Sequence, residues 1–246
     1  TAIRTLHYSY TLQQAADLLN YYDKEVEAER YRALAKTLNT ATYKLCYNVS
    51  KGLMADSREQ KSYTQHANIM TILSNTVSGD EAHSLLLRTL ADTSLAQATF
   101  YYRFYLTRAM QKTGEADQYY SQLGPWRKML SLGLTTFAET PEPTRSDSHA
   151  WASTPIYEFL ATVCGIMPAE PGFKSVLISP ALGELEEVRG ELPHPMGKIK
   201  VSFKKMKDKS LVGKITLPVG LRGKFEYMGY QKELRSGSQQ IKLIHQ

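Results

Sequence analysis

The chain has 246 residues, of which 42% are hydrophobic and 22% charged, and it carries a formal net charge of +6. This globular composition excludes a collagen, a disordered tail and a small disulfide-stapled fold, and the length allows one large domain or two modest ones. No apolar run is long enough to cross a bilayer, and the first residues lack the apolar segment of a signal peptide. The chain also lacks an initiator methionine, so we expect it to begin inside a longer polypeptide.

The first two thirds of the sequence predict about seven helices. Apolar residues recur there at helical spacing, and Ser78 to Glu81 has the spacing of a capping box. Gly114 and Gly133 each follow a periodic segment, where a left-handed stop is expected. Helices joined by short turns should pack as antiparallel hairpins. The expected helices cover residues 12–22, 26–48, 65–77, a segment from 78, one ending at 114, one ending at 133, and 153–163.

The pattern changes after Gly165, where prolines become frequent and the apolar period drops to two. Short segments with turn residues between them predict a small antiparallel β-sandwich. The expected strands are 175–178, 187–191, 198–204, 211–217, 224–227 and 240–244. The fold class is therefore mainly α with a C-terminal all-β domain, and we place the domains at residues 1–167 and 168–246.

The positive charge is unevenly distributed. Residues 1–165 contain equal numbers of acidic and basic side chains, so the whole excess lies in residues 166–246. Lys198, Lys200 and Lys204 alternate there with apolar residues, which is typical of the solvent face of a half-buried strand. A nucleic-acid surface is the weaker interpretation, because no known nucleic-acid-binding motif accompanies the lysines. We therefore expect neither nucleic acid nor a membrane span among the interactions of this chain.

The two cysteines and the metal-ligand pattern predict no cofactor. Cys46 and Cys164 lie 118 positions apart in helical segments, which favours buried free thiols. No CxxC, HExxH or similar cluster is present, so a metal site has no support in the sequence. We expect no metal and no other cofactor.

The long connection after Gly133 concentrates polar chemistry. It contains Glu139, Asp147, His149 and Trp151, and connections of this length in compact domains are commonly functional. Carboxylates, an imidazole and an indole suit a sugar-processing site, because they supply acid–base groups, hydroxyl ligands and a ring face for stacking. Composition alone also permits a solvated loop with a capping histidine and a core tryptophan.

Several motifs carry a family resemblance. The run Leu-Gly-Leu-Thr-Thr-Phe-Ala-Glu139, then Asp-Ser-His149-Ala-Trp151, and later Pro-His-Pro-Met-Gly197 and Gln-His-Ala-Asn68, resembles the C-terminal half of bacterial α-L-rhamnosidases of glycoside hydrolase family 78. The likeness covers nearly the whole chain. Its most specific part is the glutamate followed by Ser-His-Ala-Trp, because both order and spacing match.

The resemblance implies a fold and a mechanism. Members of the family are inverting exo-glycosidases that release terminal α-linked L-rhamnose, with an (α/α)6 toroid before a β-sandwich. It implies that Glu139 is the general base and that His149 and Trp151, with Asp147 beside them, contact the sugar. Ala138 stands where the family commonly has an aromatic residue, which places the pocket wall and the sugar choice in doubt.

The general acid is missing from this sequence. The family supplies it from the first half of the toroid, in an acidic segment that is not found before residue 139. Seven helices would form a partial toroid with exposed apolar inner faces. We therefore expect a fragment that is inactive alone and whose partners are an L-rhamnose-containing glycan and the missing N-terminal half. The alternative is a non-catalytic glycan-binding or subunit-interaction module. The compartment stays open, because any signal would lie upstream of Thr1.

Overall fold

A computed structural model describes residues 1–208 and 210–244. The chain divides into two compact units, Thr1–Glu115 and Ala116–Gln246. The first unit is helical, whereas the second holds the remaining helical turns together with the β-strands. The helices before the sandwich end at Val163, the strands of the sandwich begin at Ile166, and one further 3-10 turn lies between the first two of these strands. The predicted domain boundary at residues 167–168 remains a prediction.

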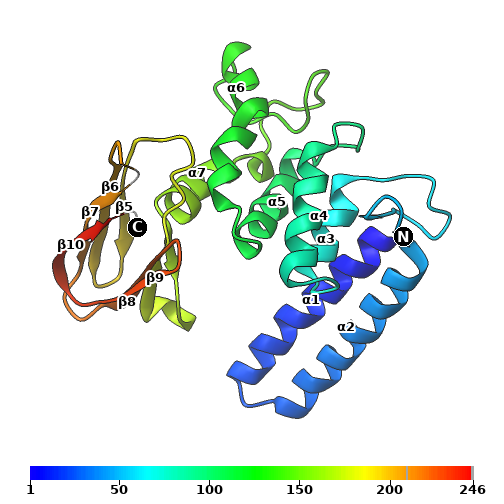
Figure 1. The fold of residues 1–246 in the computed structure, drawn as a ribbon, viewed down its shortest axis with the longest axis horizontal. Helices are drawn as coiled ribbons and strands as arrows, with labels where there is room; N and C mark the ends of the chain where they lie inside the picture. The colour runs from blue at the N-terminus through cyan, green and yellow to red at the C-terminus, as the bar shows by residue number, and fades with distance from the viewer. Residues whose placement is uncertain (209, 245–246) are drawn as a thin grey trace. The chain divides into compact units, whose positions relative to one another are not determined.

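The first unit is built from helices and one two-residue hairpin. Its long helices α1 and α2 run antiparallel and are joined by a short turn at Asp23, where φ is +57° (Figure 1). The elements are α1 (Ala2–Tyr21), α2 (Glu25–Cys46), β1 (Tyr47–Asn48), β2 (Leu53–Met54), α3 (Gln65–Leu73), α4 (Gly79–Ala91) and α5 (Phe100–Lys112).

Helix α1 starts ten residues before the predicted helix. Its buried residues are two leucines, Leu6 and Leu12, and the small residues Ala2, Ser9 and Ala16. Ser9 is fully buried and donates a hydrogen bond of 3.2 Å to the carbonyl of Ala35 on α2. Where α1 and α2 approach closely, the buried positions are occupied by serine and alanine. The regular spacing of large apolar residues, on which the sequence prediction depended, is therefore interrupted. The capping-box prediction was also wrong, because Ser78 begins α4 without a side-chain cap.

Helix α3 is the centre of the first unit. Eight of its nine residues are buried, and Ile69, Met70 and Ile72 are fully buried in the core. Its C-terminal carbonyl groups accept hydrogen bonds from other helices: Lys112 of α5 donates to Ile72, and Gln13 of α1 and Asn39 of α2 donate to Ser74, each at 2.6 Å. These bonds satisfy carbonyls that have no partner inside the helix and fix three neighbours around one end.

The second unit begins with short helical turns where longer helices were predicted. The segment before Gly133 divides at Leu123 into a 3-10 helix and an α-helix, and the segment from residue 153 ends as a π-helix. Pro125 explains the first division, since proline fits the start of an α-helix but not its interior. The elements are η1 (Ala116–Leu123), α6 (Gly124–Ser131), η2 (Ala150–Ala152), α7 (Thr154–Glu158) and η3 (Phe159–Val163).

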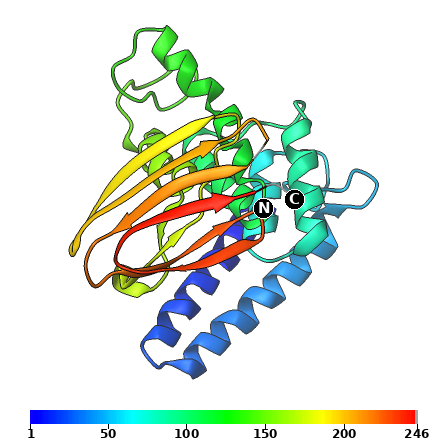
Figure 2. The same cartoon turned by 60° about the vertical axis from the view of Figure 1, so that its left-hand side comes forward.

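Two four-stranded sheets follow, with orders β3-β4-β8-β9 and β10-β7-β6-β5 (Figure 2). All strand pairs in them are antiparallel except β4 and β8, which are parallel. The elements are β3 (Ile166–Pro168), η4 (Pro171–Phe173), β4 (Ser175–Ile178), β5 (Glu187–His194), β6 (Gly197–Lys205), β7 (Leu211–Leu217), β8 (Arg222–Tyr227), β9 (Tyr230–Leu234) and β10 (Gly237–Leu243).

The two sheets meet through apolar side chains. Phe203 of β6 and Phe225 of β8 are fully buried, and their ring centroids lie 5.7 Å apart. Gly213 on β7 leaves room for this packing, because a Cβ there would lie 2.4 Å from the Phe203 ring. The fold class is confirmed: seven α-helices precede a β-sandwich in the described residues. The strands β3 and β9 were not predicted.

Both thiols should be unreactive in the folded chain. Cys46 lies in the first unit and Cys164 in the second, and both are buried. Burial raises the pKa of Cys46 and raises the pKa of Cys164 to about 11, because a thiolate loses its hydration there. The neutral Cys164 thiol therefore favours folding below its unfolded pKa near 9, and this contribution is lost as pH rises through about 11. The neutral Cys46 thiol favours folding in the same direction.

We expect Cys164 to react with Ellman's reagent at pH 8 about 100-fold more slowly in the native than in the unfolded chain, since two pKa units lower the thiolate fraction by that factor. Cys46 should also react more slowly in the native chain, because its pKa is raised as well. Absorbance of the released thiolate, followed with and without guanidinium chloride, gives both rates. Each of the variants Cys46→Ser and Cys164→Ser retains one cysteine, so the rate that it gives belongs to the remaining thiol and to the unit that contains it. Equal native and unfolded rates would show that the thiols are accessible.

Candidate functional site

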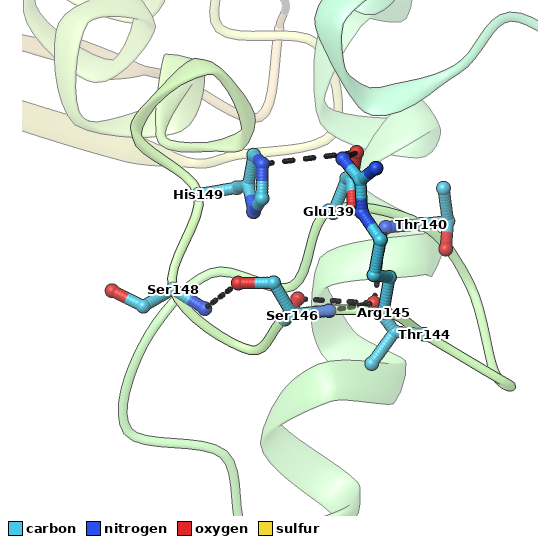
Figure 3. Close-up of polar contacts among 7 residues, drawn as sticks. All are labelled: Glu139, Thr140, Thr144, Arg145, Ser146, Ser148 and His149. Carbon is cyan, nitrogen blue, oxygen red and sulfur yellow. Dashed lines mark hydrogen bonds and ion pairs between the residues drawn. The ribbon is translucent and has the colours of Figure 1, made fainter.

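The long connection between α6 and η2 folds back on itself. The backbone N–H of Glu139 donates to the carbonyl of Ser146 at 2.9 Å, and the N–H of His149 donates to the carbonyl of Phe137 at 2.7 Å. The Thr136 hydroxyl donates to the carbonyl of Asp147. These cross-loop bonds bring residues 7 to 12 positions apart in sequence side by side, and they place Glu139 and His149 on neighbouring segments (Figure 3).

The Glu139 carboxylate is the most enclosed charged group of this loop. Its side chain is 14% exposed, whereas that of Arg145 is 78% exposed. Arg145 donates from Nε to Oε2 at 2.9 Å and from Nη2 to Oε1 at 2.5 Å, so both carboxylate oxygens are held by one guanidinium fork. A fork of this kind fixes the plane of a carboxylate better than a single charge can. Each oxygen keeps a further lone pair that can accept a hydrogen bond.

His149 lies on the other side of the same carboxylate. Its Nε2 is 3.7 Å from Oε1 of Glu139, which is too long for a hydrogen bond but close enough for attraction when the imidazole is protonated (Figure 3). The rings of His149 and Trp151 are 4.7 Å apart at an angle of 40°. Trp151 is 48% exposed, so part of its indole surface faces solvent. The structure thus brings together three of the four predicted site residues.

Asp147 does not join this group. Asp147 is exposed, and its side chain makes no hydrogen bond or ion pair among the described residues. Only its backbone carbonyl is engaged, as the acceptor of the bond from the Thr136 hydroxyl. The roles of Glu139, Asp147, His149 and Trp151 remain predictions.

Buried polar contacts anchor the segment that follows the loop. Trp126 of α6 is 8% exposed, and its Nε1 donates to the carbonyl of Ala152 at 2.7 Å. Glu158 is fully buried and accepts a hydrogen bond of 2.5 Å from the hydroxyl of Thr162, one turn further along. Trp126 therefore has a structural part in the site, since it fixes η2, which follows His149 and contains Trp151.

The hydrogen-bonding partners within the loop could not be found from sequence. Arg145 stands six residues after Glu139 in a segment without periodicity, so nothing in its spacing predicts a contact. Thr144 donates its hydroxyl to the Ser146 carbonyl at 3.0 Å, and the Ser148 N–H donates to the Ser146 hydroxyl at 3.3 Å (Figure 3). Serine and threonine frequently bond to nearby backbone in loops, and this is the only signal that the sequence offers.

Other kinds of site have no counterpart in the described part of the chain. No group of three or more His, Cys, Asp or Glu side chains there is arranged to hold a metal ion. None of its helices combines the length and apolarity that a bilayer crossing requires. Two cavities of about 790 and 480 Å³ occur in the first unit beside α1 and α2, and neither includes a predicted site residue.

A family model, a curated relative and solved structures all indicate similarity to the same family. Residues 165–242 match the model of the bacterial α-L-rhamnosidase C-terminal domain. An α-L-rhamnosidase of Alteromonas sp. (strain LOR) is 26% identical over 216 residues, which cover 81% of this chain and 23% of that protein.

Solved structures give the same fold. The family 78 rhamnosidase of Bacillus sp. GL1 superposes with a TM-score of 0.76 at 21% identity, over 92% of this chain and 27% of that one. The α-L-rhamnosidase of Aspergillus terreus gives a TM-score of 0.79 at 19% identity, over 97% and 29%. The chain therefore spans about a quarter of the length of the proteins it matches. In sequence and in fold, it resembles the C-terminal part of the α-L-rhamnosidases of glycoside hydrolase family 78.

Proposed function

We propose that this chain is part of an inverting exo-glycosidase that hydrolyses terminal α-linked L-rhamnose, and that Glu139 is its general base. The observation that carries the proposal is the Glu139 carboxylate, 14% exposed, with His149 and the exposed face of Trp151 beside it. An enclosed carboxylate next to an aromatic face is the arrangement that water activation at a sugar ring requires.

The carboxylate would act through its remaining lone pairs. A water bound to Glu139 loses a proton to the carboxylate while its oxygen attacks the anomeric carbon. The bond from that carbon to the aglycone oxygen breaks on the opposite face, and a second carboxylic acid protonates the leaving oxygen. In inverting enzymes the two carboxyl groups lie about 6.5–9.5 Å apart, which leaves room for the water. The product is β-L-rhamnose.

The neighbours of Glu139 divide the remaining tasks. Arg145 would hold the carboxylate in one plane, so that one oxygen faces the water throughout the reaction. His149 and Asp147 would bind sugar hydroxyls, and Trp151 would stack on the C–H face of the ring. One ring nitrogen of His149, Nδ1, is buried without a partner among the described residues and is available for an additional polar contact.

The general acid is assigned to the missing N-terminal half of the toroid. We use the term completed enzyme for this chain joined to that half. The chain alone should give no measurable hydrolysis of p-nitrophenyl α-L-rhamnoside, because the rest of the toroid that would enclose the sugar is absent together with the acid.

The completed enzyme should hydrolyse the same compound, and proton NMR should show β-L-rhamnose as the first-formed anomer before mutarotation. Turnover by the chain alone that Glu139→Gln abolishes would contradict the assignment of the acid. Initial release of the α-anomer would contradict the inverting mechanism.

A non-catalytic glycan-binding module is the second candidate, and the exposed face of Trp151 favours it. Calorimetry with L-rhamnose separates the two functions. Binding by wild type and Glu139→Gln, without hydrolysis by the completed enzyme, would support the binding module.

A further inference from the structure

The outer face of the sheet β10-β7-β6-β5 carries most of the net positive charge of the chain. Side chains alternate along each strand, and Ile199, Val201 and Phe203 of β6 are buried in the sandwich. The side chains between them therefore point outward, and the register places outward residues of the neighbouring strands beside them. The cations of this basic face are Arg189, Lys198, Lys200, Lys204, Lys214 and Lys242, all exposed.

The charge of this face is not a general property of the sandwich. Its six cations stand with two carboxylates, Glu187 and Glu191, which leaves a net charge of +4 out of the +6 of the whole chain. The outward side of the other sheet is balanced, with Arg222 and Lys224 against Glu226 and Glu233 on β8 and β9. Solvation of a sheet face does not require an excess of one sign, so the asymmetry calls for a partner of opposite charge.

Half of the cations on the basic face are engaged within the sheet. Glu191 pairs with Lys198 at 2.5 Å and with Lys200 at 2.9 Å, and Glu187 pairs with Arg189 at 2.6 Å. The other three, Lys204, Lys214 and Lys242, make no ion pair among the described residues, although Glu187, which pairs with Arg189, stands opposite Lys204 in the register.

The register groups these three lysines. Val212 on β7 lies opposite Lys204 of β6 on one side and opposite Lys242 of β10 on the other. The three residues form one row across the sheet, and the Cα atoms of the two lysines are about 10 Å apart, which is two strand spacings. Lys214 lies two residues along β7, in the next outward row. Ser202 and Gln240 flank Lys214 on the neighbouring strands, which adds hydroxyl and amide groups between the charges.

The residue types indicate the chemistry of the partner. The outward residues of these four strands, among those described, include no aromatic side chain, whereas single-stranded nucleic acids are bound by stacking on aromatic rings. The only large apolar residue among them is Val212, so the face has no apolar group set to enter a membrane. Separated lysine side chains can pair with carboxylate or sulfate groups that are spaced along a polymer. The hydroxyl and amide groups beside them can form hydrogen bonds with the sugar hydroxyls between those anionic groups. We propose that the basic face binds an acidic polysaccharide.

The choice of a glycan among polyanions rests on the proposed function. A rhamnosidase that held an acidic polysaccharide on its sandwich would keep the chain ends of that polymer near it between reactions. The substrate class would then be rhamnose-bearing polysaccharides with carboxylate or sulfate groups, and small rhamnosides would gain nothing from the face.

Binding can be measured with this chain itself. Biolayer interferometry at about 50 mM ionic strength would use immobilised polygalacturonate for carboxylate, dextran sulfate for sulfate and dextran as the neutral control. We expect saturable binding to at least one of the two acidic polymers and none to dextran, with affinity falling steeply as salt is added. The variant Lys204→Gln, Lys214→Gln, Lys242→Gln should bind about tenfold more weakly, since it loses three exposed charge contacts.

The matched control removes the same charge from the first unit. Lys36→Gln, Lys44→Gln, Lys61→Gln replaces three exposed lysines and should bind within about twofold of wild type. Equal losses in the two variants would show that net charge alone drives binding, and would overturn the proposal. So would equal affinity for a single-stranded oligonucleotide, or no binding to either polymer. If the triple variant does not fold, Lys214→Gln alone should weaken binding two- to threefold.

The test is independent of the catalytic assignment. Glu139→Gln should bind the polymer as wild type does, because it is not part of the face. Polymer binding with no rhamnoside hydrolysis by the completed enzyme would support the proposal for the basic face and contradict the proposed function. Rhamnoside hydrolysis with no polymer binding would support the proposed function and contradict the proposal for the basic face.

Discussion

Glu139→Gln in the completed enzyme should lower kcat for p-nitrophenyl α-L-rhamnoside by about 10²–10⁴-fold, the range that a general base contributes. Glutamine has nearly the same shape, and its amide oxygen can still accept from Arg145, but it cannot take a proton from water. KM should change little, because binding of the sugar is assigned to other side chains. Initial rates over a range of substrate concentrations give both constants.

The control is Glu142→Gln, an exposed carboxylate three residues along the same loop. It should retain wild-type kcat, since it makes no contact with Glu139 among those observed. A loss of less than about threefold in Glu139→Gln, or an equal loss in both variants, would contradict the assignment of the base. Melting temperatures should stay close to wild type, because an ion pair with an arginine that is 78% exposed adds little stability.

Azide provides an independent test of the same role. In Glu139→Ala, the anion can attack the anomeric carbon without a general base as p-nitrophenolate leaves. We expect azide to raise the rate and to yield the β-rhamnosyl azide. A variant that is merely misfolded would not respond to azide.

Phe225→Ala should destabilise the second unit by about 3–5 kcal/mol, the usual cost of removing a fully buried phenylalanine. The ring is 0% exposed and packs on Phe203 of the opposite sheet, so its loss leaves a cavity between two sheets that cannot close without shifting β-strands. Urea unfolding gives the change in the free energy of unfolding from the shift of the midpoint at constant slope. Both tryptophans of the chain lie in the second unit, so their fluorescence follows that unit.

Val219→Ala is the control for this experiment. Val219 is 87% exposed in the turn between β7 and β8, and its truncation should change the free energy of unfolding by less than about 0.5 kcal/mol. A change below about 1 kcal/mol in Phe225→Ala would show that the contact between the sheets contributes little to the stability of the unit.

The sequence located elements whose signals are local. The strands around Lys198, Lys214 and Phe225 were predicted because alternation with period two is visible within a few residues. Gly114 and Gly133 were identified as helix stops, and both have positive φ, at +80° and +77°. Helix α4 begins after Ser78 as predicted but without the side-chain cap, and the Glu81 carboxylate accepts a hydrogen bond from Tyr43 of α2. The start of α1 was missed because its packing depends on groups elsewhere in the chain.

The sequence by itself determined that helices precede a β-sandwich, that the net charge lies in the last third, and that Glu139, His149 and Trp151 share one polar connection. Order, period and composition are properties of neighbouring residues, so they can be read without a fold. Only the tertiary structure decided that Arg145 holds both oxygens of Glu139 while Asp147 stays exposed, and that Lys204, Lys214 and Lys242 lie on one face. Those outcomes depend on loop closure and strand register, which are set by contacts between residues distant in sequence.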